Sequence, residues 1–146
     1  MNASTPTRIV IDLTTASSER VLLPAMRRRV YHSYSENLNA GVASYCLEEI
    51  MAEKIRSLFQ RVRHRDIYDI RYLADRVNPD TVRNILLRKC ESEKVVPDRF
   101  ALAGARKRFS ASWNASLRHQ MKIVPDFEEV FERVPACVEL YTQATG

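Results

Sequence analysis

The segment SYCLEEIMAEKIRSLFQRVRHRDIYDIRYLADRV, residues 44–77, decides how this chain folds. Apolar side chains recur at helical spacing in both of its halves, which predicts two core-facing helices, the first of them beginning near Cys46. The apolar positions of the first half are Leu47, Ile50, Met51, Ile55, Leu58, Phe59 and Val62. Those of the second half are Ile67, Ile70, Leu73, Ala74 and Val77.

Charged side chains interrupt both apolar faces. At about 100° per residue, Lys54 lies only about 20° from the direction of Leu47, in the middle of the first face. Asp66 lies inside the apolar arc of the second helix, and Asp69 lies at its edge. A buried ammonium without a partner is costly, so we expect a carboxylate or a phosphate beside Lys54.

Ordinary structural roles also fit these residues. Lys54 can pack its stem against the rim of the core and keep its ammonium in water. Asp66 follows the basic stretch RVRHR and can serve as the N-cap of the second helix. The spacing of the residues leaves both interpretations open.

The strings LEEIMAEKIRSLFQR and RDIYDIRYL together resemble the signature of the nucleotidyltransferase AbiEii/AbiGii toxin family, within the polymerase-beta-like superfamily. In that family a helix with a Glu-Lys pair precedes a basic turn and an Arg-Asp-x-Tyr-Asp helix. The segment from Trp113 to Phe127 is similar to the C-terminal part of the family, so the resemblance extends over almost the whole chain. It implies nucleotidyl transfer from a nucleoside triphosphate with Mg²⁺ to an RNA such as tRNA.

The resemblance also implies roles for individual residues. Lys54 would contact nucleotide phosphate and stabilise charge in the transition state. Asp69 would orient Lys54 or the nucleotide with support from Asp66, and Arg65 would pair with an acid or contact RNA backbone. Asp12 resembles a strand acid near the metal-binding pair of polymerase-beta-like enzymes, which makes it a candidate metal ligand. The ordinary alternative for Asp12 is a polar residue on the solvent side of a strand.

The chain departs from the family in its metal-binding motif. The family takes these ligands from a Gly-Ser turn and an Asp-x-Asp pair, and this sequence contains neither. It therefore resembles the C-terminal portion of such a toxin, and the sequence leaves open whether the chain is an enzyme. One function class is a nucleotidyltransferase whose metal-binding acids come from another chain or segment. The alternative is a catalytically inactive truncated homologue that binds a nucleotide, RNA or protein.

The partners and location follow from the same resemblance and from composition. We expect a nucleotide, an RNA, a cognate antitoxin or complementing chain, and a homo-oligomer as candidate partners. The formal charge of +5 is compatible with nucleotide or nucleic-acid binding without establishing it. Cys46, Cys90 and Cys137 lack paired spacing and are predicted to be reduced thiols of a cytoplasmic protein. No stretch has the pattern of a signal peptide or a membrane span.

The expected fold is mainly α, a helical bundle preceded by a short strand element, as a remnant of an α+β nucleotidyltransferase domain. Residues 1–45 would form the strand-containing end of a nucleotidyltransferase-like core, and residues 46–146 a helical C-terminal domain, together one compact unit. We predict strands at 8–13 and 42–43 and a short helix at 25–34. Further helices are expected at 81–91, after Pro97 and after Pro125, the last one bent or ended by Pro135.

Overall fold

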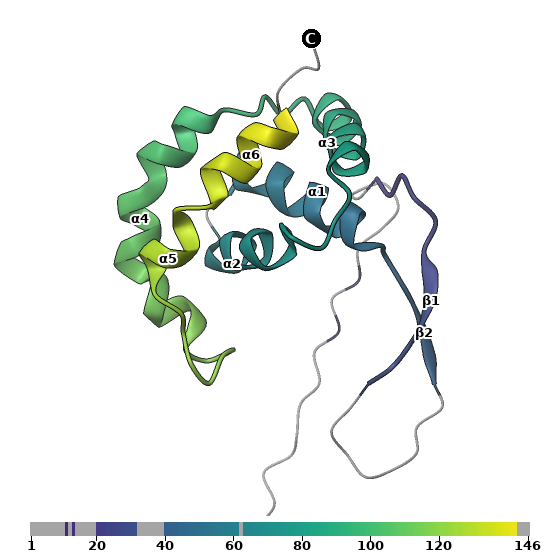
Figure 1. The fold of residues 1–146 in the computed structure, drawn as a ribbon, viewed down its shortest axis with the longest axis horizontal. Helices are drawn as coiled ribbons and strands as arrows, with labels where there is room; N and C mark the ends of the chain where they lie inside the picture. Colours follow the sequence, from purple (N-terminus) through teal and green to yellow (C-terminus); the bar gives the residue numbers. More distant parts are fainter. Residues whose placement is uncertain (1–10, 12, 14–19, 32–39, 62, 143–146) are drawn as a thin grey trace, which may run out of the picture.

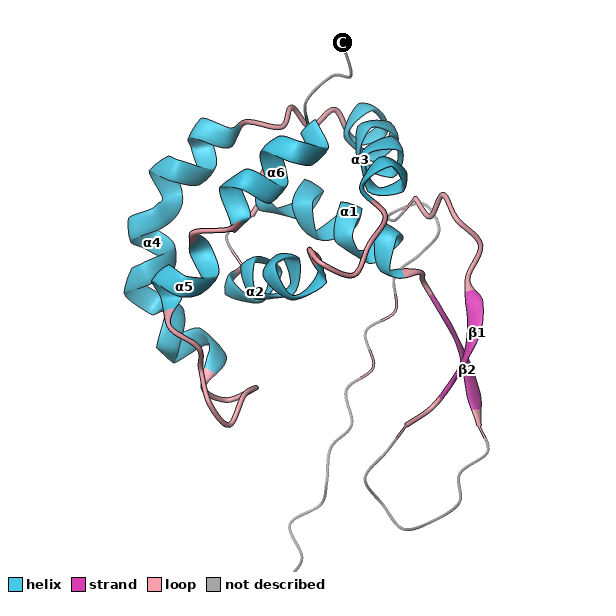
Figure 2. Cartoon of the chain, viewed as in Figure 1, coloured by secondary structure: helices cyan, strands magenta, loops and turns pink. Residues whose placement is uncertain are grey.

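The computed structural model describes residues 11, 13, 20–31, 40–61 and 63–142, with the side chains of 99–101 left out. A short two-stranded sheet precedes the helices, as Figures 1 and 2 show. The described elements are β1 (Met26–Arg29), β2 (Gly41–Ser44), α1 (Leu47–Leu58), α2 (His64–Leu73), α3 (Pro79–Glu93), α4 (Arg99–Leu117), α5 (Phe127–Phe131) and α6 (Val134–Thr142). The predicted mainly helical fold with a preceding strand element is confirmed.

Helix α1 is the central element of the bundle. It packs against α2 on one side and α3 on another, while α6 packs against α3 and α4 (Figure 1). The apolar faces expected from the sequence meet here, because Met51, Ile55, Ile67 and Ile70 are all fully buried. The connection from α1 to α2 is short, so the two helices are held side by side with their polar inner residues close together.

Local sequence signals explain where the helices begin. Asn78 caps α3 by accepting a hydrogen bond from the Thr81 N–H, and Pro79 follows at a position that tolerates proline. Asp126 caps α5 by accepting from two backbone N–H groups of its first turn. Cys46, near which the first helix was predicted to begin, occupies the N-cap of α1, and its Sγ accepts a hydrogen bond from the Glu49 N–H at 3.4 Å.

The N-terminal region differs from expectation in one clear respect. The helix predicted at 25–34 is wrong, because Met26–Arg29 form β1 and pair antiparallel with Gly41–Ser44. Pairing with a strand further along the chain overrides the local helical pattern. The brief strand predicted at Val42 and Ala43 is confirmed. Of the strand predicted at 8–13, only Ile11 and Leu13 are described, and neither is part of a strand.

The C-terminal region holds one helix more than expected. The helix after Pro125 ends at Phe131, and a new helix, α6, begins at Val134. Pro135 lies in the first turn of α6, where its missing N–H leaves no helical hydrogen bond unmade. It therefore helps to begin a helix instead of ending one. None of the described helices is long and apolar enough to cross a membrane.

Candidate functional site

The ammonium of Lys54 lies between two carboxylates at the α1–α2 contact. Its Nζ is 2.9 Å from Asp66 Oδ1 and 2.7 Å from Asp69 Oδ2. Lys54 comes from the middle of α1, and the two acids stand three residues apart on one face of α2, so one cation reaches both. The structure thus brings together the three residues that the sequence placed on facing helices, and we call them the Lys54 cluster.

Solvent reaches the three side chains of the Lys54 cluster unequally. The side chain of Asp66 is 2% exposed, that of Lys54 24% and that of Asp69 36%. Asp66 is not the N-cap of α2, because Arg63 takes that position without a side-chain cap. The cluster therefore has a buried end at Asp66 and an open end at Asp69.

Charge and burial act in opposite directions on Lys54. Burial lowers the pKa of Lys54, but the hydrogen bonds and charges of Asp69 and Asp66 outweigh that effect and raise the pKa above its ordinary value of 10.5. Lys54 is therefore a cation at neutral pH. Its ammonium is held in place by carboxylates, which gives it a fixed orientation.

Arg61 lies next to the buried end of the cluster, and two further arginines lie at the start of α2. Arg61 Nε is 3.7 Å from Asp66 Oδ2, an oxygen that is buried and has no hydrogen-bond partner. Arg65 is exposed and, with Arg63, lines a hollow of about 240 Å³ between the start of α2 and the end of α4. The arginines of the α1–α2 turn can attract an anion toward Lys54.

The described residues do not form a metal site. They contain no group of three or more His, Cys, Asp or Glu side chains arranged to hold a metal ion. Asp66 and Asp69 are both engaged by Lys54. Asp12, the candidate metal ligand from the sequence, lies outside the described residues.

A second charged cluster, which the sequence reasoning missed, lies on another side of α1. Lys89 of α3 places its Nζ 2.9 Å from Glu49 Oε1, 3.3 Å from Glu53 Oε2 and 2.7 Å from the Arg20 carbonyl oxygen. The Glu49 carboxylate also accepts hydrogen bonds from the backbone N–H groups of Leu22 and Leu23, each at 3.2 Å. Glu49 and Lys89 are each 2% exposed. We call Lys89, Glu49 and Glu53 the Lys89 cluster.

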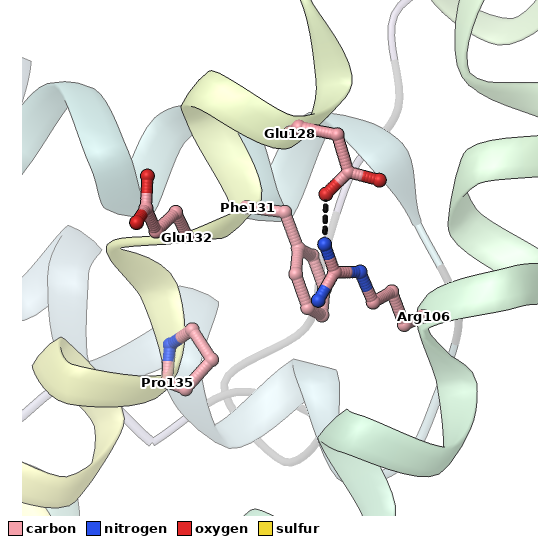
Figure 3. Close-up of a pocket in the computed structure, with 5 residues that line it drawn as sticks. All are labelled: Arg106, Glu128, Phe131, Glu132 and Pro135. Carbon is pink, nitrogen blue, oxygen red and sulfur yellow. Dashed lines mark hydrogen bonds and ion pairs between the residues drawn. The ribbon is translucent and has the colours of Figure 1, made fainter.

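Another hollow lies away from both clusters. It has a volume of about 450 Å³ and lies between α4 and the α5–α6 region, lined by Arg106, Glu128, Phe131, Glu132 and Pro135. Figure 3 shows Arg106 next to the ring of Phe131 and paired with Glu128. Its two facing charges satisfy each other, so this hollow offers a ligand less than the open end of the Lys54 cluster does.

The cysteines are unpaired in the structure, as their spacing in the sequence predicts. Cys46, Cys90 and Cys137 are all unpaired thiols in the structure. Burial raises the pKa of both Cys90 and Cys137, which favours the protonated thiol at neutral pH.

Comparison with known proteins gives one match. The family model described as "Nucleotidyl transferase AbiEii toxin, Type IV TA system" matches residues 2–133 of the chain. No curated protein and no solved structure matches the chain. The matched range contains every residue of the Lys54 and Lys89 clusters.

Proposed function

The chain belongs to the AbiEii family of nucleotidyl transferase toxins, and we propose that its Lys54 cluster binds the phosphates of a nucleoside triphosphate for nucleotidyl transfer to an RNA such as tRNA. In that reaction a hydroxyl oxygen of the RNA forms a bond to the α-phosphorus. The bond from the α-phosphorus to the β-bridging oxygen breaks, pyrophosphate leaves, and the hydroxyl proton passes to water. A fixed cation beside the phosphates stabilises the charge that moves onto their oxygens.

The observation that carries this proposal is the incomplete hydrogen bonding of Lys54. A lysine ammonium has three N–H donors, and Asp66 and Asp69 accept from two of them. The side chain is 24% exposed, so the third donor can point to solvent. A phosphate oxygen can accept that third hydrogen bond without displacing either carboxylate.

The two acids would have different tasks. Asp66 is buried and holds the ammonium in one position, while the more exposed Asp69 can accept a hydrogen bond from a hydroxyl of the bound nucleotide. Arg65 and Arg61 would attract the polyphosphate and offset the negative charge of the acids. Each of these tasks concerns binding and orientation, which the chain's own residues can supply.

Mg²⁺, which the family resemblance implies, would neutralise charge on the phosphates. The described residues do not fit such an ion, because Asp66 and Asp69 are tied to Lys54 and no three-ligand group accompanies them. We propose that the metal-binding acids are supplied by another chain or by residues outside those described, including Asp12.

Calorimetric titration with each nucleoside triphosphate and Mg²⁺ tests the proposal. We expect binding to the unchanged protein, loss of binding in Lys54→Ala, and unchanged binding in Lys107→Ala. Lys107 is a matched control because it is an exposed lysine on α4, away from the cluster. The proposal fails if no triphosphate binds, or if Lys54→Ala binds as well as the unchanged protein.

The alternative function is that of a non-catalytic module which binds a nucleotide, RNA or protein. The absence of an Asp-x-Asp pair from the sequence favours it over independent catalysis. Incubating the protein with labelled triphosphate, Mg²⁺ and tRNA separates the two. Label transferred to RNA supports the enzyme, and nucleotide binding without transfer supports the module or an enzyme that needs a complementing chain.

The family also suggests partners and a location. Because its members belong to type IV toxin–antitoxin systems, we propose a cognate antitoxin as a partner. Self-association is a further proposal, which a monomer in light scattering would contradict. A cytoplasmic location, where triphosphates and tRNA are available, fits the proposed reaction.

A further inference from the structure

Strands β1 and β2 form a narrow ribbon beside the N-terminal end of α1. They pair with each other and make little contact with the helices (Figure 1). All four residues of β1, Met26 to Arg29, are exposed. An exposed two-stranded element that packs so little on the described helices is available to a partner.

Three consecutive arginines, Arg27, Arg28 and Arg29, make this ribbon cationic on both faces. Side chains alternate along a strand, so Arg27 and Arg29 share one face, about 7 Å apart along the strand, and Arg28 lies on the other. Their partners across the ribbon are small or apolar: Ala43, Val42 and Gly41. Arg27 Nε lies only 2.7 Å from the place a Cβ on Gly41 would take, so this glycine leaves room for the arginine to cross to β2.

The described carboxylates do not neutralise these arginines. The ion pairs found among the described residues lie in the helical region and its connections, outside β1. Among the described residues, Arg28 donates a hydrogen bond to the sulfur of Met26 at 3.9 Å, which leaves its charge without a counterion. Three exposed cations without a described acid favour an anionic partner.

The Lys89 cluster anchors the segment that leads into the ribbon. Lys89 holds the Arg20 carbonyl, and Glu49 holds the N–H groups of Leu22 and Leu23. At the end of β2, only Tyr45 and Cys46 separate the strand from α1. Because the segment before β1 and the segment after β2 are both held on α1 and α3, the ribbon has a defined direction. This lowers the conformational entropy that is lost when a partner binds.

Exposed aromatic rings lie at the two ends of the arginine row. Tyr31 follows β1 and is 87% exposed, and Tyr45 follows β2 and is 41% exposed. Cations that contact phosphates together with aromatic rings that stack on bases are typical of surfaces for single-stranded nucleic acid. An acidic protein segment would use the arginines alone and give the tyrosines no planar partner.

We propose that the ribbon is an RNA-binding arm, with Arg27, Arg28 and Arg29 on backbone phosphates and Tyr31 and Tyr45 stacked on unpaired bases. The inference deepens the proposed function and rests on it, because it names the surface that holds the RNA acceptor. It places RNA binding on residues separate from the Lys54 cluster. The two can therefore fail separately.

The test measures binding of a fluorescein-labelled single-stranded RNA of about 12 nucleotides, within the usual site size, by anisotropy and without nucleoside triphosphate. The triple variant Arg27→Gln, Arg28→Gln, Arg29→Gln should weaken binding at least tenfold. If three phosphate contacts are lost, the slope of log affinity against log salt should become shallower by about 2. A matched control, Lys107→Gln, Arg108→Gln, Lys122→Gln, removes the same charge from exposed sites on and after α4 and should weaken binding less than threefold.

A second variant tests the aromatic part of the arm. Tyr31→Ala with Tyr45→Ala should weaken binding of single-stranded RNA fivefold or more, while the affinity for polyglutamate stays unchanged. Both tyrosines are exposed, and circular dichroism before titration confirms that each variant keeps its helices. This measurement separates stacking from charge.

Several outcomes would overturn the inference. If both arginine and control triples weaken RNA binding equally, net charge alone explains binding and the arm is wrong. If polyglutamate competes as well as RNA and the tyrosine variant changes nothing, the surface is one for an acidic protein. If Lys54→Ala loses nucleotide binding but the triple arginine variant keeps its affinity for RNA, the proposed function still holds. That result rejects only the proposal that the ribbon binds RNA.

Discussion

Helix α1 carries two lysine-centred clusters that use the same chemistry in different surroundings. In the Lys54 cluster the lysine side chain is 24% exposed, and two carboxylates accept from its ammonium. In the Lys89 cluster the lysine is 2% exposed, and Glu49, Glu53 and the Arg20 carbonyl surround its Nζ. Among the described residues, the Lys54 ammonium thus has acceptors for two of its three N–H donors, and the Lys89 ammonium has acceptors for all three.

This difference separates the proposed phosphate-binding site from an ion pair that only stabilises the fold. A buried cation with every donor used holds chain segments together and has nothing to offer a ligand. A cation fixed by carboxylates at its buried side and open at the other can take a phosphate with little reorganisation. Burial and the number of unused donors therefore distinguish the two roles better than the presence of a Lys–Asp or Lys–Glu pair does.

The largest expected effect is on stability at the Lys89 cluster. Lys89→Met keeps the length of the side chain but leaves the Glu49 carboxylate buried without its cation. Removing one partner of a buried pair costs about 3–5 kcal/mol, so the free energy of unfolding should fall by that amount in urea titration. A loss below about 1 kcal/mol would show that water reaches Glu49 and would remove the contrast between the clusters.

The same variant also reports on the anchored segment. Lys89 holds the Arg20 carbonyl, so the peptide bond after Arg20 should be cut by trypsin faster in Lys89→Met than in the unchanged protein. Lys54→Met serves as control and should leave that cleavage rate unchanged.

A smaller stability effect is expected at the Lys54 cluster. Lys54→Met deprives the buried Asp66 of its cation, but Arg61 remains 3.7 Å away and water reaches Asp69. We expect a loss of about 1–2 kcal/mol in urea titration, between the values for exposed and buried pairs. Nucleotide binding should vanish in the same variant, whereas Lys89→Met should keep it under conditions where it is folded. If Lys54→Met lowers the free energy of unfolding as much as Lys89→Met does, the Lys54 cluster has a structural role like that of the Lys89 cluster.

The sequence predicted one of these clusters and missed the other for a physical reason. Lys54 and Asp66 are 12 positions apart on consecutive helices, and helical periodicity places each on the core-facing side of its helix. Lys89 and Glu53 are 36 positions apart on helices whose contact depends on the whole bundle. Glu49 can be recognised from the sequence as an acid in the first turn of α1. Nothing in its local sequence shows that its carboxylate accepts hydrogen bonds from the backbone N–H groups of Leu22 and Leu23.

The arginine triplet shows the same limit. Met26–Arg29 is a strand because Gly41–Ser44 lies beside it, and this pairing cannot be derived from the triplet itself. The apolar core of α1 and α2 and the helices that follow Pro97 and Pro125 depend on local features, and the sequence predicts them. Strand β1 and the Lys89 cluster, which the sequence does not predict, depend on contacts between segments that are far apart in the chain.

The pH dependence of stability should also differ between the clusters. The carboxylates raise the pKa of Lys54 in the folded protein above 10.5, so its stabilising contribution is complete below pH 10.5 and is lost as the pH rises through the folded pKa. The difference in unfolding free energy between the unchanged protein and Lys54→Met should therefore shrink above pH 10.5, by about 1 kcal/mol or less. A constant difference up to pH 12 would contradict the ion pair.

Glu53 of the Lys89 cluster should show the opposite pH dependence. Burial raises the pKa of Glu53, but Arg56 and Lys89 outweigh it and hold the pKa below 4.5. The contribution of the Glu53 carboxylate to the free energy of unfolding is present above pH 4.5, and it is lost as the pH falls through the pKa of Glu53 in the folded protein. The stability difference between the unchanged protein and Glu53→Gln should therefore fall in acid and stay constant in mild alkali, in urea titrations at both ends of the pH range.

The smallest expected effect lies at the start of α1, the helix that carries both clusters. The Sγ of Cys46 accepts from the Glu49 N–H at 3.4 Å, and a hydroxyl is a stronger acceptor than a thiol. Cys46→Ser should raise the free energy of unfolding by about 0.5 kcal/mol, while Cys46→Ala should lower it by a similar amount. The two changes should leave nucleotide and RNA binding unaltered, because the cap fixes where the helix begins and touches neither ammonium. Equal stability of the Ser and Ala variants would mean that the thiol packs at this position without capping the helix.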